Sequence, residues 1–258
     1  KNFPEIFKSI NIVLYEKSEK LKKIQKKRII SGKVSWVKDL KKIKKGPVIF
    51  FGNEFLDALP IKQFKEKDGD ILEKFAFLKK NKVDFIFKKA LRKQIKKLKT
   101  FNLIKKNGII EYPEYGFKEL DVVCKKIKEL NGGALFFDYG YKIEKNVSTL
   151  QSVMNHKFND INKNLGNADI TYLVNFNLYE KYFKFYGLNV ENIISQSKFL
   201  QKMGIIERFK IASSKMNLEK KSDLYFRLKR LIDPKFMGES FKVLFAKNKN
   251  CKFKLAFE

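Results

Sequence analysis

The chain has 258 residues, enough for one large domain or for a domain with a subdomain, and its 44% apolar content excludes a disordered protein. Its net charge of +29 is typical of nucleic-acid-binding proteins, but only five of the 57 basic residues are arginine and the lysines are spread along the whole chain. We therefore interpret the charge as a bias in the overall amino-acid composition and not as a binding surface. Nucleic acid stays an alternative partner. No run of about 20 apolar residues exists, so the sequence predicts no membrane span.

The two cysteines, Cys124 and Cys251, lie far apart and neither belongs to a CxxC pair. This pattern argues against a metal site or a disulfide framework and favours a reducing, intracellular compartment. The chain begins at Lys1 without an initiator methionine and without the apolar segment of a signal peptide. We therefore expect it to be a fragment of a longer protein.

The first third alternates strand and helix. Short apolar runs predict three strands, and a helical spacing of apolar residues between the first two predicts a helix with Ser18 as its N-cap. The predicted strands are residues 10–15, 33–37 and 48–51, and the predicted helix is 18–30. Strands separated by helices indicate right-handed crossovers and a parallel sheet.

The middle of the chain predicts an antiparallel insert at residues 61–88, because three strand-like runs are separated by short turns. Helical and apolar patterns then alternate to the end of the chain, with a helical subdomain expected at 176–232. The remaining predicted helices are 90–98, 117–130, 178–186, 197–203 and 221–231, and the remaining predicted strands are 109–111, 134–137, 241–245 and 253–257.

Three polar clusters directly follow predicted strands, where open α/β sheets bind their ligands. Glu16 follows the first strand and could accept hydrogen bonds from a cofactor ribose, or be an ordinary acid at a helix start. The segment Asn53–Pro60 follows the strand 48–51. If a helical turn begins at Phe55, Glu54 and Asp57 share one face. The third cluster, Asp138-Tyr139-Gly140, follows the strand 134–137.

The segment Asn53–Pro60, with the sequence NEFLDALP, resembles the signature of a family of S-adenosylmethionine (SAM) dependent methyltransferases. That family includes the mitochondrial arginine methyltransferase of complex I assembly. Further strings match the family in the same order over nearly the whole chain: YEKS at 15–18, SW at 35–36, DL at 39–40, GGA at 132–134, DYG at 138–140, NHK at 155–157, GNADIT at 166–171 and MG at 237–238. The joint order and spacing of these strings carry the resemblance.

The resemblance implies an α/β fold of the class I methyltransferase (Rossmann-like) type. Its sheet would be mostly parallel with helices on both faces, interrupted by the antiparallel insert and followed by a helical C-terminal part. Residues 1–258 would form one methyltransferase domain. The family's first strand and glycine-rich loop have no counterpart between Lys1 and Ile10, so the chain is expected to begin after them.

The resemblance also implies a cofactor, SAM, and roles for individual residues. Glu16 would bind the ribose, and Asp39 by its side chain and Leu40 by its backbone would contact the adenine. The segment Asn53–Pro60 would line the junction of methyl donor and acceptor, so Asn53 is expected both to touch the cofactor and to take part in catalysis.

The expected activity is protein arginine N-methylation of a subunit of respiratory complex I type. Carboxylates such as Glu54 and Asp57 could pair with the guanidinium, which is always charged and presents five donors. His156, the only histidine, could act as a general base or make a structural or substrate-positioning hydrogen bond. The expected location is the bacterial cytoplasm, or the mitochondrial matrix in a eukaryote.

Two other functions stay open at this point. The chain could be a non-catalytic assembly or binding protein that keeps the methyltransferase fold, because fold alone does not imply activity. It could also bind nucleic acid. The nucleic-acid amino-methyltransferase signature, an Asn or Asp followed by two prolines and an aromatic residue, is absent, and Asn53-Glu54-Phe55 stands in its place. The sequence gives no oligomeric state.

Overall fold

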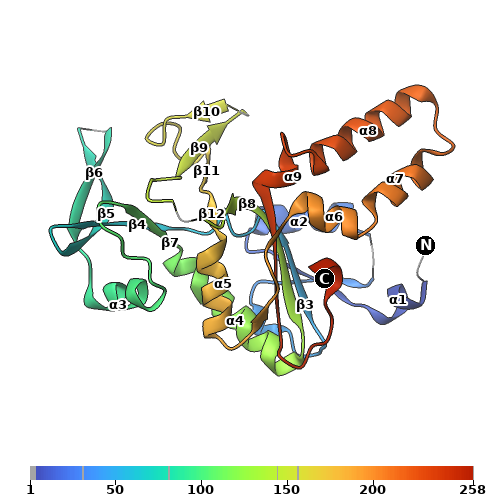
Figure 1. Ribbon diagram of the computed structural model, residues 1–258, viewed down its shortest axis with the longest axis horizontal. Helices are drawn as coiled ribbons and strands as arrows, with labels where there is room; N and C mark the ends of the chain where they lie inside the picture. Colours follow the sequence, from blue (N-terminus) through green and yellow to red (C-terminus); the bar gives the residue numbers. More distant parts are fainter. Residues whose placement is uncertain (1–3, 31, 81, 144, 156, 258) are drawn as a thin grey trace. The chain divides into compact units, whose positions relative to one another are not determined.

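The computed structural model describes residues 4–30, 32–80, 82–143, 145–155 and 157–257. The chain forms two compact units, Lys1–Gly46 and Pro47–Glu258 (Figure 1). No helix in the described ranges is both long enough and apolar enough to cross a bilayer.

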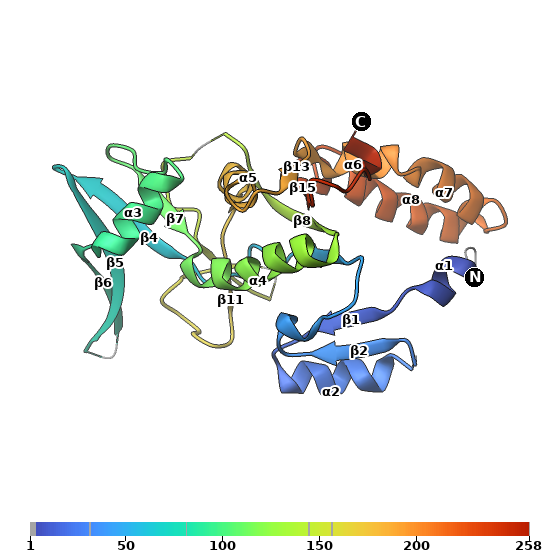
Figure 2. The same cartoon turned by 90° about the horizontal axis from the view of Figure 1, so that it is seen from below.

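The first unit is built around two parallel strands, β1 (Ile12–Tyr15) and β2 (Val34–Val37), whose residues pair from Ile12 with Val34 to Tyr15 with Val37. Helix α2 (Glu19–Arg28) connects the two strands (Figure 2). Ser18 caps this helix by accepting a hydrogen bond from the backbone N–H of Leu21, as its sequence position predicts. The unit is completed by α1 (Pro4–Ser9) and the 3₁₀ turn η1 (Leu40–Lys42).

The second unit contains a six-stranded sheet with β8 (Gly133–Tyr141) at its centre. Strand β3 (Ile49–Asn53) and strand β12 (Val174–Asn175) pair with β8 in parallel, whereas β15 (Phe241–Lys247) pairs with it antiparallel. The short strands β13 (Asn189–Val190) and β14 (Ile194–Ser195) pair with β15. The predicted strands at 48–51, 134–137 and 241–245 are therefore confirmed.

Helices α4 (Glu114–Leu130) and α5 (Phe176–Phe185) contribute most of their buried apolar side chains to the core of this unit. Helix α4 ends at Asn131, which adopts a left-handed conformation, and Gly132 follows. A Cβ atom on Gly132 would lie 1.8 Å from the carbonyl oxygen of Val48, so only glycine allows β8 to start beside β3. The helix prediction for 117–130 is confirmed, with a start three residues earlier.

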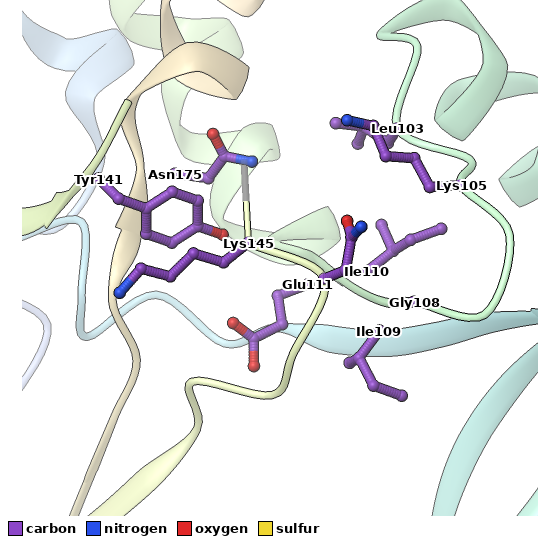
Figure 3. A pocket seen from close by; sticks show the side chains of 10 residues that line it. Leu103, Lys105, Gly108, Ile109, Ile110, Glu111, Tyr141, Lys145 and Asn175 are labelled. Atoms are coloured by element: carbon purple, nitrogen blue, oxygen red, sulfur yellow. The ribbon is translucent and has the colours of Figure 1, made fainter. Parts of the chain in front are cut away.

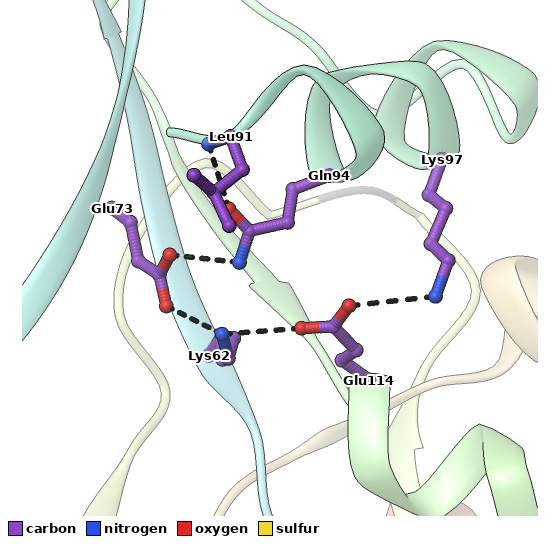
Figure 4. Close-up of polar contacts among 6 residues, drawn as sticks. All are labelled: Lys62, Glu73, Leu91, Gln94, Lys97 and Glu114. Carbon is purple, nitrogen blue, oxygen red and sulfur yellow. Dashed lines mark hydrogen bonds and ion pairs between the residues drawn. The ribbon is translucent and has the colours of Figure 1, made fainter. Parts of the chain in front are cut away.

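A separate antiparallel sheet of four strands has the order β6-β5-β4-β7. Its strands are β4 (Lys62–Lys67), β5 (Asp70–Lys79), β6 (Lys82–Lys89) and β7 (Ile109–Tyr112), and helix α3 (Arg92–Thr100) follows β6. A network of polar contacts ties this sheet to α3 and α4 (Figure 4). The Glu73 carboxylate pairs with Lys62 at 2.8 Å and accepts a hydrogen bond from Gln94 at 2.8 Å, while Lys62 also pairs with Glu114 at 3.2 Å.

The rest of the unit contains a small antiparallel sheet and four helices. The sheet consists of β9 (Gln151–Met154), β10 (Lys157–Asn159) and β11 (Asp169–Thr171), which the sequence patterns missed. The helices are α6 (Gln196–Lys202), α7 (Ile205–Ser213), α8 (Leu218–Ile232) and α9 (Met237–Ser240). The sequence patterns predict neither α7 nor α9.

The strand predicted at 253–257 is wrong. Residues 253 and 254 have no regular structure, and the 3₁₀ turn η2 (Leu255–Phe257) follows. The reason is side-chain packing. Phe257 stacks on Phe245 of β15 with ring centroids 5.8 Å apart, and the ammonium of Lys247 donates a hydrogen bond to the carbonyl of Phe253. The apolar side chains of this segment therefore pack on one face of the sheet, and the segment does not add a strand to its edge.

Candidate functional site

Glu16 lies at the carboxyl end of β1, where its backbone N–H donates to the carbonyl of Val37 at the end of β2. Its carboxylate is held by two neutral donors. Oε1 accepts from the backbone N–H of Ser18 at 2.7 Å and Oε2 accepts from Nε2 of Gln25 at 3.1 Å. The other end of the Gln25 amide accepts from the indole N–H of Trp36 at 2.9 Å. Within the described residues each carboxylate oxygen accepts one hydrogen bond, which leaves it able to accept another, so the fixed carboxylate suits a pair of ribose hydroxyls.

Asp39 and Leu40 follow β2 at the same edge of the two-stranded sheet. Asp39 is exposed and caps η1, because Oδ1 accepts from the backbone N–H of Lys41 at 2.9 Å. Leu40 is 5% exposed and is the only buried residue among the side chains described in this unit. The structure thus brings Glu16, Asp39 and Leu40, the three residues expected to hold the nucleoside, to one end of a parallel strand pair.

In the second unit, the segment Asn53–Pro60 forms a loop at the carboxyl end of β3. Three backbone N–H groups of this loop donate hydrogen bonds to residues of β8. The N–H of Glu54 donates to the carbonyl of Phe137 at 2.9 Å. The N–H groups of Leu56 and Asp57 both donate to Oδ2 of Asp138, at 2.8 and 3.1 Å. These contacts give the backbone of the loop a defined shape.

The helical turn expected from Phe55 is not formed. Glu54 has a φ of +50°, in the left-handed region, and a turn follows in which the N–H of Leu59 donates to the carbonyl of Leu56. The prediction that Glu54 and Asp57 share one helical face is therefore wrong. Asn53 and Glu54 are exposed, with Nδ2 of Asn53 donating to Oε1 of Glu54 at 3.3 Å. Asp57 is 5% exposed and its Oδ2 accepts from the hydroxyl of Tyr139 at 2.5 Å.

Two buried carboxylates lie beneath the loop, and burial shifts the pKa of each. Burial raises the pKa of Asp57, while the hydrogen bond from Tyr139 opposes the shift. Burial and then the charge of Asp57 raise the pKa of Asp138 to about 7, although three backbone N–H groups donate to its carboxylate. Within the described part of this strongly basic chain, neither carboxylate is paired with a cation.

His156, the candidate base, lies outside the described residues. The sequence does not predict which residues hold the loop. Asp138 and Tyr139 follow an apolar run of strand length, which is a usable signal for a site, but no pattern in the sequence predicts their contacts with the loop. The hydroxyl of Tyr172 donates to the carbonyl of Leu56 at 2.8 Å. No pattern in the sequence predicts this contact.

A second polar site lies around Glu111 on β7, next to Tyr141 and Lys145 (Figure 3). The cavity holds about 20 Å³, roughly the space of one water molecule, which is too small for a cofactor. Glu111 is 8% exposed and accepts hydrogen bonds from Gln63 and from the backbone N–H groups of Thr149 and Leu150. We interpret Glu111 as an anchor for the loop before β9.

Comparison with known proteins gives consistent results. Residues 1–194 match the family described as "Putative S-adenosyl-L-methionine-dependent methyltransferase". The chain is 30% identical over 197 residues to a protein named mitochondrial protein arginine methyltransferase NDUFAF7 homolog from Caenorhabditis elegans, covering 72% of this chain and 45% of that protein. It is 26% identical over 212 residues to human NDUFAF7, covering 81% and 47%. The chain thus spans about half the length of these curated relatives.

Two solved structures share the fold. A COG1565 superfamily member from Burkholderia thailandensis bound to S-adenosyl-homocysteine superposes with a TM-score of 0.78 at 20% identity, covering 96% of this chain and 66% of that one. A native structure of a COG1565 protein from the same organism gives 0.79 at 21% identity, covering 96% and 68%. The α/β methyltransferase fold expected from the sequence is confirmed. The chain belongs to the family of S-adenosyl-L-methionine-dependent methyltransferases that its first 194 residues match.

Proposed function

We propose that this chain carries the cofactor-binding and acceptor-binding residues of a SAM-dependent protein arginine N-methyltransferase that acts on a subunit of respiratory complex I type. The observation that carries the proposal is the Asn53–Pro60 loop, which is held at a strand end and exposes an amide and a carboxylate. The names of the relatives, which are arginine methyltransferases, supply the substrate class. The same names print a mitochondrial location for the relatives, and the location proposed for this protein is the mitochondrial matrix in a eukaryote or the cytoplasm in a bacterium.

The cofactor side of the site is assigned to Glu16, Asp39 and Leu40. Bound SAM supplies an electrophilic methyl group on a sulfonium. Glu16 accepts hydrogen bonds from the ribose hydroxyls, and its orientation is fixed by Ser18 and Gln25. Asp39 and the backbone of Leu40 bind the adenine. Asn53, at the end of β3, would both touch the cofactor and take part in catalysis.

The acceptor side is assigned to the exposed part of the loop. Methyl transfer is an in-line displacement, so the protein chiefly orients the acceptor nitrogen and excludes water. Glu54 binds the substrate guanidinium through charge-assisted hydrogen bonds, which concentrates electron density on the attacking nitrogen. Asp57 adds negative charge from below the loop. His156 accepts the released proton or positions the substrate by a hydrogen bond.

The domain organisation proposed with this function is one methyltransferase domain over 1–258. The antiparallel segment 61–88 is an insert, and the helical segment 176–232 is a subdomain.

The decisive experiment incubates the complete protein with labelled SAM and an extract of its source cells, followed by mass spectrometry of the labelled product. Label on an arginine side chain is the expected result.

Glu54→Gln and Asp57→Asn should each lose methyl transfer while SAM affinity, measured by calorimetry, is kept. Loss of SAM binding with normal turnover at saturating SAM would refute the assignment of these residues to the acceptor.

A further inference from the structure

The loop that carries Asn53 and Glu54 is held from below by two residues to which no role has been assigned. We propose that Asp138 and Tyr139 are positioning residues for methyl transfer, which set the shape of the Asn53–Pro60 loop so that it presents Asn53 and Glu54 to the acceptor. This inference rests on the proposed function. The inference adds to the proposed function a mechanism by which strand β8 controls the geometry of the site.

The register of the sheet explains why Asp138 reaches the loop. Asn53, the last residue of β3, pairs with Phe137 of β8, so Asp138 is the next residue on β8 at the point where the loop leaves β3. The Asp138 side chain is fully buried and its Oδ2 accepts both loop N–H groups, from Leu56 and Asp57. Two successive amides directed at one oxygen fix the orientation of the peptide between them.

Tyr139 holds the same loop through a side chain. Its hydroxyl donates to Oδ2 of Asp57 at 2.5 Å, which keeps the Asp57 carboxylate buried. Tyr172 also holds the loop, because its hydroxyl donates to the Leu56 carbonyl at 2.8 Å, and the same hydroxyl contacts the Tyr179 hydroxyl at 2.9 Å. With residues 56 and 57 fixed in this way, the exposed side chains that remain at the start of the loop are those of Asn53 and Glu54.

The energetic cost of this arrangement argues for a functional origin. A buried carboxylate with no cationic partner destabilises the folded state, even when backbone N–H groups donate to it. Oδ1 of Asp57 is also buried and has no hydrogen-bond partner among the described residues. The backbone amides of Asp57 and Ala58 favour its charged form, but neither is aligned for a hydrogen bond to Oδ1. Two buried carboxylates that have no cationic partner among the described residues are unfavourable for stability, and proteins keep such features at functional sites.

The inference is tested in the complete protein with two conservative variants. Tyr139→Phe removes one hydroxyl. Asp138→Asn keeps the shape but turns an NH₂ group toward backbone N–H groups that need an acceptor. Both should lower the rate of labelling at saturating SAM by about 10- to 100-fold, because small displacements of reacting groups are costly. The dissociation constant of SAM should change less than about twofold. The matched controls are Tyr225→Phe and Asp223→Asn, exposed positions on α8, which should leave the rate unchanged.

Two further readouts separate positioning from simple stabilisation. Hydrogen exchange of the peptide 53–60 should accelerate by at least about tenfold in both variants, since its amides lose their acceptors or their support. In Tyr139→Phe the acid limb of the pH–rate profile should move to higher pH, because the lost hydroxyl had opposed the burial that raises the pKa of Asp57. A lowered melting temperature with unchanged rate, exchange and pH profile would overturn the inference. Absence of methyl transfer by the unsubstituted protein would instead refute the proposed function, and the exchange measurement would then decide whether Asp138 and Tyr139 hold the loop.

Discussion

Glu54 and Asp57 are three residues apart, yet one is exposed and the other is buried against Tyr139. Glu54 is therefore the carboxylate that an acceptor can reach. We expect Glu54→Gln to lower methyl transfer by about 100-fold, the usual range for a group that stabilises charge in a transition state. SAM affinity should stay within about twofold. Rates measured with labelled SAM check this, and Glu219→Gln, exposed on α8, is the control. A rate within about threefold of the unsubstituted enzyme would contradict the role of Glu54.

The Glu16 carboxylate is expected to be the main determinant of ribose binding. Glu16→Gln removes the charge and one acceptor. Hydrogen bonds to charged groups contribute about 1.5–3 kcal/mol, so SAM affinity should fall about 10- to 100-fold. Calorimetry on the complete protein measures this. Glu19→Gln serves as control, because Glu19 makes only an exposed ion pair with Lys38. If both substitutions change the affinity equally, Glu16 has no specific role.

The buried pair Asp57 and Asp138 should make stability depend on pH. The pKa of Asp138 rises from 3.8 to about 7 through burial and the charge of Asp57, so the folded chain holds a proton that the unfolded chain releases. The contribution of this group to stability is therefore present below about pH 4 and lost as pH rises to about 7. Urea unfolding at several pH values should show a smaller decline in Asp57→Asn than in the unsubstituted protein. Parallel stability curves would show that the two acids do not interact.

The sequence could predict part of this site and not the rest. Glu16 and the Asn53–Pro60 loop follow apolar runs of strand length, and the carboxyl ends of such strands are where ligands bind. The hydrogen bonds from Leu56 and Asp57 to Asp138 cross more than 80 residues of sequence. Such pairing depends on the register of β3 against β8, which periodicity does not reveal. The left-handed φ of Glu54 is a similar case, because nothing local in an Asn-Glu-Phe string favours it.

At the scale of elements, local patterns predicted those strands and helices whose apolar faces enter one core. Helix α4 and strands β8 and β15 are examples. The elements that local patterns did not predict correctly are determined by tertiary contacts. The segment 253–257 alternates like a strand, but Phe257 packs on Phe199 and Phe245. Strands β9 to β11 are short and polar, so only their mutual pairing defines them.

The polar network of the four-stranded sheet should contribute measurably to its stability (Figure 4). Glu73 is 4% exposed and joins β5 to Lys62 of β4 and Gln94 of α3. Glu73→Gln removes the charge that pairs with Lys62, and we expect a loss of about 1–3 kcal/mol in the free energy of unfolding. Asp70→Asn breaks the exposed pair of Asp70 with Lys89 in the same sheet and should cost less than about 0.5 kcal/mol. Equal losses would mean that the buried network adds nothing.

At the scale of the whole molecule, the two compact units differ in how much core they have. Between residues 4 and 46 the only buried side chain described is Leu40, whereas the second unit buries side chains from two sheets and several helices. Segments with few buried apolar contacts open at low free-energy cost. We therefore expect amide hydrogens in residues 12–42 of the complete protein to exchange much faster than those of β8 and β15 when SAM is absent.

Cofactor binding should reduce this difference in exchange rate, because Glu16, Asp39 and Leu40 all lie in the first unit. A ligand that binds only the folded form adds about 2.7 kcal/mol at a concentration of 100 times its dissociation constant. Opening of residues 12–42 should then become about 100-fold rarer, which hydrogen exchange followed by mass spectrometry can resolve peptide by peptide. Adenosine at the same occupancy should protect the same peptides, because the proposed contacts of Glu16, Asp39 and Leu40 are all to the nucleoside. Protection confined to residues 47–258 would place the nucleoside elsewhere and remove the basis for assigning Glu16 to the ribose.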